Sequence, residues 1–112
     1  MDTAELMRRF NAAFQNHDPA LLDDLVAEDC VIENTDGTRH EGGTACLTLW
    51  RGIASNKDAW FDLEDTVVLG DHAIIYWHYH WGEGAADSVR GVNLMRVRDS
   101  RIVEARGYVK GK

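Results

Sequence analysis

The chain has 112 residues, 45% of them hydrophobic, which suits one domain with one core. Its formal net charge of −7 argues against a nucleic-acid partner, because phosphate backbones are bound by clustered Lys and Arg. The apolar runs are far shorter than the roughly 20 residues of a membrane-spanning helix, and the amino terminus is amphipathic rather than signal-like. We therefore expect a single domain over residues 1–112, cytoplasmic and without membrane contact.

The first half of the chain has helical periodicity. Asp2 with Glu5 three residues later resembles a capping box, and apolar residues follow at helical spacing. Asp18 and Pro19 are typical of the N-cap and first position of a second, short helix. A third helix is predicted over 44–55. Three helices thus precede the strand-rich half.

Strand-like patterns occupy the rest of the chain. A first strand is predicted at 30–34, before a glycine-rich loop. Four more follow as a meander, at 60–69, 72–82, 88–98 and 101–109. This order predicts an α+β domain, with three helices packed on a strongly curved antiparallel sheet. Gly91 lies inside a predicted strand, where a bend would curve the sheet around a pocket.

The chain contains two cysteines, Cys30 and Cys46, which form no CxxC motif. The favoured interpretation is two buried thiols, since free cysteine is often a small core residue. A disulfide between them stays open as the alternative.

Several segments resemble the SnoaL-like group of the nuclear transport factor 2-like superfamily, which includes polyketide cyclases and is related to ketosteroid isomerase. They are "LMRRF", "DPALLDDLVAEDCVIENT", "HEGGTAC" and "VRGVNLMRVRDSRIVEARGYVKG". The resemblance implies a cone-shaped half-barrel with a deep, mostly apolar internal cavity, commonly in a dimer. Because one fold hosts many activities, it does not select among isomerisation, cyclisation, epoxide opening and simple binding.

The resemblance can be followed at the working positions of ketosteroid isomerase, which uses a Tyr and two Asp. Phe10 stands at the Tyr position, Asn34 at that of the general base, and Asn93 at that of the second Asp. None of the three replacements ionises, so steroid-isomerase chemistry is not expected.

Asn34 and Asn93 nevertheless retain a chemical use as amide donors to a carbonyl or an oxyanion. Alternatively, they satisfy each other or the backbone. Glu33 is expected on the opposite face of its strand from Asn34, and would act as a base only if a bulge reversed it.

The segment "YWHYHWGEG" carries the titratable groups of the predicted cavity. An ungapped count back from Asn93 onto the related pattern places Tyr76, His78 and His80 on the cavity side. His78 or His80 would then act as general base, with Asn34 and Asn93 polarising a carbonyl. An odd insertion in the loop at 82–87 would exchange the two faces of the strand.

Two other interpretations of the histidines stay open. Each could be a hydrogen-bonded structural residue, as in many half-buried strands. The spacing His78-x-His80 could also hold a metal, but no third ligand is apparent in the sequence. The prediction is therefore no metal and no cofactor.

The same phase places the row Trp77, Tyr79 and Trp81 on the outer face of the sheet. An exposed row of this kind would form a large apolar patch. A second subunit packed on it by two-fold symmetry would cover the patch, which favours a homodimer through the sheet. Cover by arginines and neighbouring strands of the same chain is the alternative.

The leading functional hypothesis is a cofactor-independent isomerase or cyclase that moves a proton on a small, apolar carbonyl compound. The expected substrate-binding walls are Phe10, Phe14, Trp50, Trp60 and Tyr76. The alternative is a non-catalytic protein that binds a hydrophobic ligand. An inward histidine pair favours the enzyme, and an outward pair favours the binder.

Overall fold

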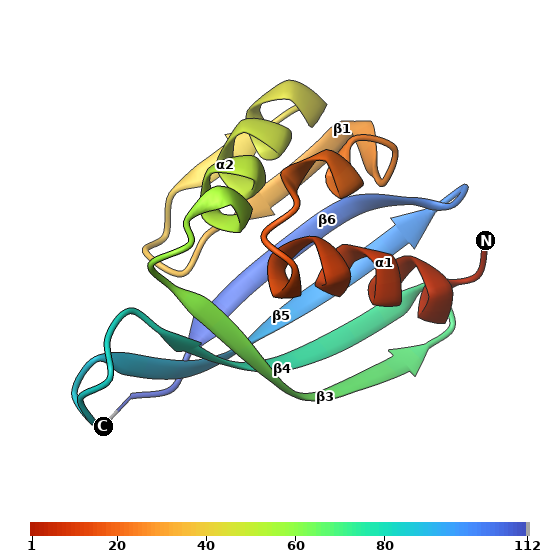
Figure 1. The fold of residues 1–112 in the computed structure, drawn as a ribbon. Helices are drawn as coiled ribbons and strands as arrows, with labels where there is room; N and C mark the ends of the chain where they lie inside the picture. The colour runs from red at the N-terminus through yellow and green to blue at the C-terminus, as the bar shows by residue number, and fades with distance from the viewer. Residues whose placement is uncertain (112) are drawn as a thin grey trace.

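Six strands form one curled, unclosed sheet, and two α-helices lie against one of its faces (Figure 1). The structure is a computed structural model that describes residues 1–111. The elements are α1 (Thr3–Gln15), a 3₁₀ turn η1 (Pro19–Leu22), β1 (Val26–Glu33), β2 (Arg39–Glu41), α2 (Gly43–Ser55), β3 (Trp60–Leu69), β4 (His72–His80), β5 (Ser88–Arg98) and β6 (Arg101–Val109). The strand order is β2-β1-β6-β5-β4-β3.

Helix α1 begins as the sequence predicts. The Asp2 carboxylate accepts a hydrogen bond from the backbone N–H of Glu5 at 2.8 Å. The Glu5 side chain pairs with Arg8 and Arg9, and these hydrogen bonds lower the pKa of Glu5 to about 2. Leu6 and other apolar residues of the helix are buried against the sheet. A side-chain cap and an apolar stripe therefore fix where this helix starts and how it docks.

The predicted second helix is wrong. Pro19–Leu22 forms only a 3₁₀ turn, and Asp18 makes no side-chain cap. Leu22 and Leu25 are still buried, as an amphipathic segment requires. However, β1 already begins at Val26, so the segment has too few residues to propagate an α-helix before the chain extends. The domain has two α-helices within residues 1–111, and not three.

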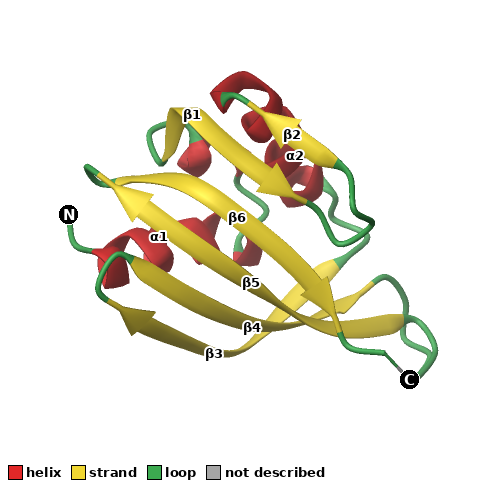
Figure 2. Ribbon diagram, turned by 180° about the vertical axis from the view of Figure 1, so that it is seen from behind, coloured by secondary structure: helices red, strands yellow, loops and turns green. Residues whose placement is uncertain are grey.

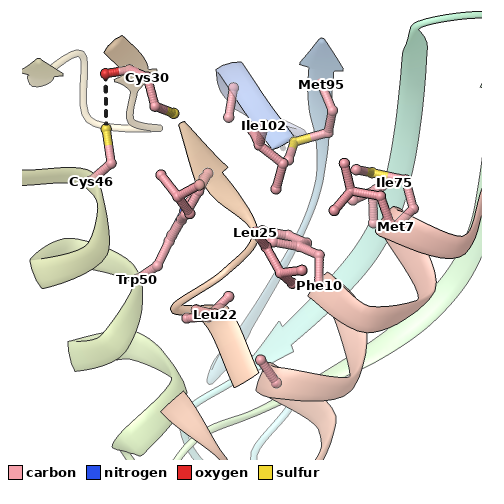
Figure 3. Packing of buried hydrophobic residues seen from close by; sticks show 14 of the residues in the cluster. Met7, Phe10, Leu22, Leu25, Cys30, Cys46, Trp50, Ile75, Met95 and Ile102 are labelled. Carbon is pink, nitrogen blue, oxygen red and sulfur yellow. Dashed lines mark hydrogen bonds between the residues drawn. The ribbon is translucent and has the colours of Figure 1, made fainter. Parts of the chain in front are cut away.

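Helix α2 packs closely on β1. Its N-cap is Gly42, with a φ of 93°. A Cβ atom at Gly43 would lie 2.8 Å from the carbonyl oxygen of Ala27, so this approach requires glycine. The Cys46 thiol donates to the Cys30 carbonyl oxygen at 3.3 Å (Figure 3). Both cysteines are free and buried, in agreement with the favoured interpretation.

The sheet departs from the predicted meander at one edge. Strands β3 to β6 are antiparallel neighbours, close to the predicted bounds. β1, however, pairs with β6 in parallel, and β2 adds a short antiparallel strand that the sequence analysis treated as loop. The purely antiparallel prediction was therefore wrong. The chain passes through α2 and the meander before its last strand pairs with its first. Because those two strands are far apart in sequence, no local sequence pattern predicts their pairing.

Register shifts in β3 between Leu63 and Asp65, and between β5 and β6 at Arg96, accompany the curl of the sheet (Figure 2). Gly91 causes no register shift. A Cβ there would lie 2.5 Å from both the Trp77 ring and the Tyr108 carbonyl oxygen. Glycine at this position therefore lets the Trp77 ring and strand β6 approach strand β5 closely.

The core lies between the helices and the inner face of the sheet. Met7 and Phe10 of α1, Trp50 of α2, and Ile75 and Met95 of the sheet all belong to one buried cluster (Figure 3). Neither described helix has the length and apolarity needed to cross a membrane.

Candidate functional site

Two adjoining cavities lie between the inner face of the sheet and the helices. The larger has a volume of about 250 Å³ and lies beside α2, and the smaller, about 40 Å³, lies beside α1. Phe61, Trp77 and Asn93 line both of them. These three side chains therefore stand at the centre of the candidate site.

The register between β4 and β5 decides which face of β4 lines the cavities. Ile75 pairs with Asn93, and Trp77 pairs with Gly91. Directly paired residues project to the same side, so Asn93 shares a face with Ile75 and Trp77. Ile75 and Trp77 are buried, with exposed fractions of 2% and 7%, and Tyr79 also lines the larger cavity.

The predicted phase of this strand was therefore wrong. Tyr76, His78 and His80 lie on the outer face, and His78 contacts Ser88 there rather than the cavity. The prediction depended on an ungapped count across the loop at 82–87, and the register of β4 with β5 reverses the faces that this count gave. Hydrophobic alternation was the better signal, because Ala73, Ile75, Trp77 and Tyr79 are apolar or aromatic while the alternate positions hold three histidines.

Asn93 is held by a hydrogen bond from the indole of Trp77. The Trp77 Nε1–H donates to Asn93 Oδ1 at 3.2 Å. Because this bond occupies the amide oxygen, it fixes the flip of the amide, and the Nδ2 amino group makes no hydrogen bond to another described residue. An amide held in this way can donate to an oxygen atom of a bound molecule.

Asn34 lies on the lining of the larger cavity at the end of β1. The Asn34 side-chain Oδ1 accepts a hydrogen bond from the backbone N–H of Thr35 at 2.9 Å, and the Asn34 backbone N–H donates to the Thr38 carbonyl oxygen. Asn34 thus organises the turn that follows β1. Asn34 and Asn93 both reach this cavity, but they are satisfied by different partners rather than by each other.

Aromatic rings form much of the remaining wall. The ring of Phe10 lies 4.9 Å from those of Phe14 and Trp50 between centroids, and Phe61 lies 4.5 Å from Tyr79. Phe10 and Phe14 line the smaller cavity, and Trp50 lines the larger one. These three predicted walls are therefore at the site.

Two other predicted walls are not at the site. Trp60 and Tyr76 are on the outer face, with exposed fractions of 38% and 40%. In their place stand Phe61, Trp77 and Tyr79, which the sequence analysis left out. The error of phase in β4 accounts for the exchange of Tyr76 for Trp77 and Tyr79. The exchange of Trp60 for its neighbour Phe61 is a separate error, on β3.

The polar groups of the cavities are mostly neutral. Burial raises the pKa of Tyr79, so its hydroxyl stays protonated at neutral pH. Asn11 and Gln15 contribute amides to the smaller cavity. Glu33, next to the buried Ile32, is the one carboxylate among the described lining residues, and those residues include no imidazole.

The family of the chain follows from comparison with known proteins. The SnoaL-like domain family matches residues 7–105. The chain belongs to this family. An NTF2-like protein of unknown function from Mesorhizobium loti is 60% identical, over 97% of this chain and 91% of that one, with a TM-score of 0.90. The resemblance seen in the sequence is thereby confirmed.

More distant structures share the fold of this SnoaL-like domain. A candidate polyketide cyclase from Sinorhizobium meliloti is 22% identical, with a TM-score of 0.77 over 92% of this chain and 93% of that one. An LEH-like epoxide hydrolase from M. tuberculosis is 23% identical, with a TM-score of 0.75 over 95% and 76%. No curated protein matches the sequence. At these identities the likeness establishes the fold alone.

Proposed function

We propose that this SnoaL-like domain binds a small, largely apolar molecule with an oxygen acceptor in the cavity between the sheet and α2. The Trp77–Asn93 hydrogen bond is the observation that carries the proposal, because it orients a neutral amide donor among aromatic walls. A mostly apolar pocket with a few placed polar groups is typical of small-molecule sites. The volume of about 250 Å³ suits a compact ligand.

The placement of titratable groups favours binding over catalysis. A proton transfer next to a carbonyl needs a base within hydrogen-bond reach of the substrate. His78 and His80, the two predicted bases, are on the opposite face of the sheet from Asn93. The ketosteroid isomerase positions hold Phe10, Asn34 and Asn93, and these side chains do not titrate.

Catalysis as an isomerase or cyclase acting on an apolar carbonyl compound is the second candidate function. One observation favours it: the free Nδ2 of Asn93 is available to stabilise an oxyanion. Glu33 is the one carboxylate on the lining of the larger cavity, but it pairs with Arg106, the partner of Leu94, and therefore projects to the outer side of β1 as the sequence predicts. It would have to turn into the cavity to supply the base. Neighbours in fold named as a cyclase and an epoxide hydrolase support the idea that such cavities admit reactive organic molecules.

Asn93→Asp tests the binding proposal. The substitution keeps an acceptor for the Trp77 indole but replaces the amide donor by a carboxylate, which repels a carbonyl oxygen. The affinity for alicyclic and aromatic ketones, measured by tryptophan fluorescence, should fall by about tenfold or more. One hydrogen bond contributes roughly 0.5–1.5 kcal/mol, and the repulsion from the new charge adds to the loss of that bond. Hydrocarbons of the same shape should lose much less.

Asn56→Asp, the same change just after α2 and away from the cavities, is the matched control. Equal ketone affinity in wild type and Asn93→Asp would contradict the proposed role of Asn93. Exchange of the α-hydrogens of a bound ketone with deuterium, measured by NMR, separates the two functions. Exchange that Glu33→Gln abolishes would establish the catalytic candidate.

We also propose that the chain forms a homodimer through the outer face of the sheet. Tyr76, Leu94 and Tyr108 lie on adjacent strands of this face, with exposed fractions of 40%, 39% and 47%. An apolar patch that spans three strands is a common subunit interface. The row first expected there is different, because Trp77 and Tyr79 point into the cavity.

A further inference from the structure

Three potential metal ligands meet on the outer face of the sheet, opposite the cavity. Asp62 of β3 is the direct cross-strand partner of His78 of β4, and His80 follows two residues later on the same face. One donor atom from each residue lies within 4.8 Å of the others. The register of two hydrogen-bonded strands thus supplies the third ligand that the sequence alone did not reveal.

We propose that Asp62, His78 and His80 bind a divalent transition-metal ion such as Zn²⁺. Two imidazole nitrogens and one carboxylate oxygen are a donor set that Zn²⁺ prefers, with water completing the tetrahedron. Tetrahedral zinc ligands lie about 3.3–3.5 Å apart, given metal–ligand distances of about 2.0–2.1 Å. Asp62, with a side chain 63% exposed, is free to close the remaining gap by rotating.

His80 is held in place in a way that suits a ligand. Its ring stacks on Trp60, with centroids 5.0 Å apart and planes 7° apart. Its Nε2 is buried and lacks a directed hydrogen bond, although Asp62 Oδ2 lies 2.8 Å away. This buried nitrogen therefore lies beside a carboxylate but makes no well-aligned hydrogen bond to it. A cation bound between the two would give both groups a partner.

Ser88 supports the second imidazole. The His78 Nε2 and Ser88 Oγ are 2.8 Å apart, and Ser88 is the cross-strand partner of His80. When Nε2–H donates to the serine, the lone pair of His78 is on Nδ1 and is available to the metal. Metal-ligating histidines almost always donate their other ring N–H to such a group, which fixes the tautomer.

The surrounding charges permit a cation. Arg90 lies across from His78 on β5, but its guanidinium is paired with Glu64 at 2.9 Å. The two histidine rings are 4.1 Å apart between centroids, so protonating both would place like charges together. A divalent ion would bind the lone pairs of both rings in their neutral form.

The experiment uses the untagged chain, stripped of metals with a chelator and titrated with Zn²⁺ by calorimetry. One ion per chain should bind saturably, and Co²⁺ should give the visible absorption of a four-coordinate site. Asp62→Asn and His80→Gln should each weaken binding by at least tenfold, and Ser88→Ala by about tenfold. Urea unfolding of each variant checks that it is folded.

His72→Gln is the matched control. His72 also lies beside an aspartate, with its Nδ1 2.7 Å from Asp71 Oδ1, but both side chains are well exposed and are not part of the three-ligand cluster. The His72→Gln variant should bind Zn²⁺ with the same affinity as the wild type. The absence of saturable binding, binding unchanged by either Asp62→Asn or His80→Gln, or an equal loss in His72→Gln would overturn the proposal. Asn93→Asp should leave Zn²⁺ binding unchanged, because this site does not depend on the cavity.

Discussion

At the scale of single residues, Gly91 connects the shape of the sheet to the cavity. Its missing side chain leaves room for both the Trp77 ring and the Tyr108 carbonyl oxygen. Trp77 in turn holds Asn93 by its indole hydrogen bond. A side chain at Gly91 would therefore displace the Trp77 ring and, through it, the Asn93 amide that is the hydrogen-bond donor of the candidate site.

Gly91→Ala should destabilise the fold and weaken ketone binding. The new methyl would lie 2.5 Å from both the Trp77 ring and a backbone oxygen, and overpacking of this kind costs roughly 1–3 kcal/mol or more. Urea unfolding measures the loss. Gly52→Ala is the control with the opposite expected sign, because Gly52 lies in α2 with open space around it, and helix propensity favours alanine by about 0.5–1 kcal/mol. A Gly91→Ala variant as stable as wild type would show that the strands separate at little cost.

At the scale of elements, α2 and β1 meet through two thiols. The Cys46 thiol donates to the Cys30 carbonyl, and both side chains are fully buried. Burial raises the pKa of both thiols above their ordinary value of 9.0. The folded chain therefore keeps these protons at a pH at which the unfolded chain releases them.

Stability should consequently fall as the pH rises above about 9. Because each thiol has a higher pKa in the folded state than in the unfolded state, it stabilises the fold fully at a pH below its pKa in the unfolded state. That stabilisation is lost as the pH rises toward and through its pKa in the folded state. The slope is at most about 1.4 kcal/mol per pH unit for each thiol. Urea midpoints between neutral and alkaline pH measure it. The Cys30→Ala/Cys46→Ser variant removes both titrating groups and should show a shallower decline, and an equal decline would assign the effect to other residues.

Strand β4 shows how far sequence could predict the elements and the site. Its bounds were nearly correct, because turn residues stand on both sides of an apolar run. Its phase was wrong, because side chains alternate with period two, so any odd error in the count across the loop reverses every one of them. That one error moved His78 and His80 into the predicted site and left Trp77 and Tyr79 out. Phe10 and Asn93 do line the cavities, and their expected positions did not depend on that count.

At the scale of the whole molecule, the two faces of the sheet have separate properties. Helices α1 and α2 cover the inner face of the sheet (Figure 1). That face holds the aromatic cavities. The outer face holds the apolar residues Tyr76, Leu94 and Tyr108, and near its edge the Asp62, His78 and His80 cluster. The proposed ligand and the proposed second copy would therefore bind on opposite faces, without competing.

Leu94→Glu tests the homodimer. Leu94 is on the middle one of the three strands that form the apolar patch. A charge there should prevent two copies from packing together, and a wild-type dimer should become a monomer in sedimentation velocity. Leu69→Glu is the control, because Leu69 is even more exposed but ends the edge strand β3. A wild type that sediments as a monomer, or a Leu94→Glu variant that stays dimeric, would contradict the proposed interface.

The sequence by itself determined the family, the α+β class, the cap of α1 and nearly all bounds of the four meander strands. These properties depend on residues that are close together in the chain. The tertiary structure decided the parallel pairing of β1 with β6, the reduction of the second helix to a 3₁₀ turn, and which face of β4 is buried. Only the fold brings Asp62 beside His78 and His80, because cross-strand register depends on residues distant in sequence, and the spacing along a single strand does not encode it.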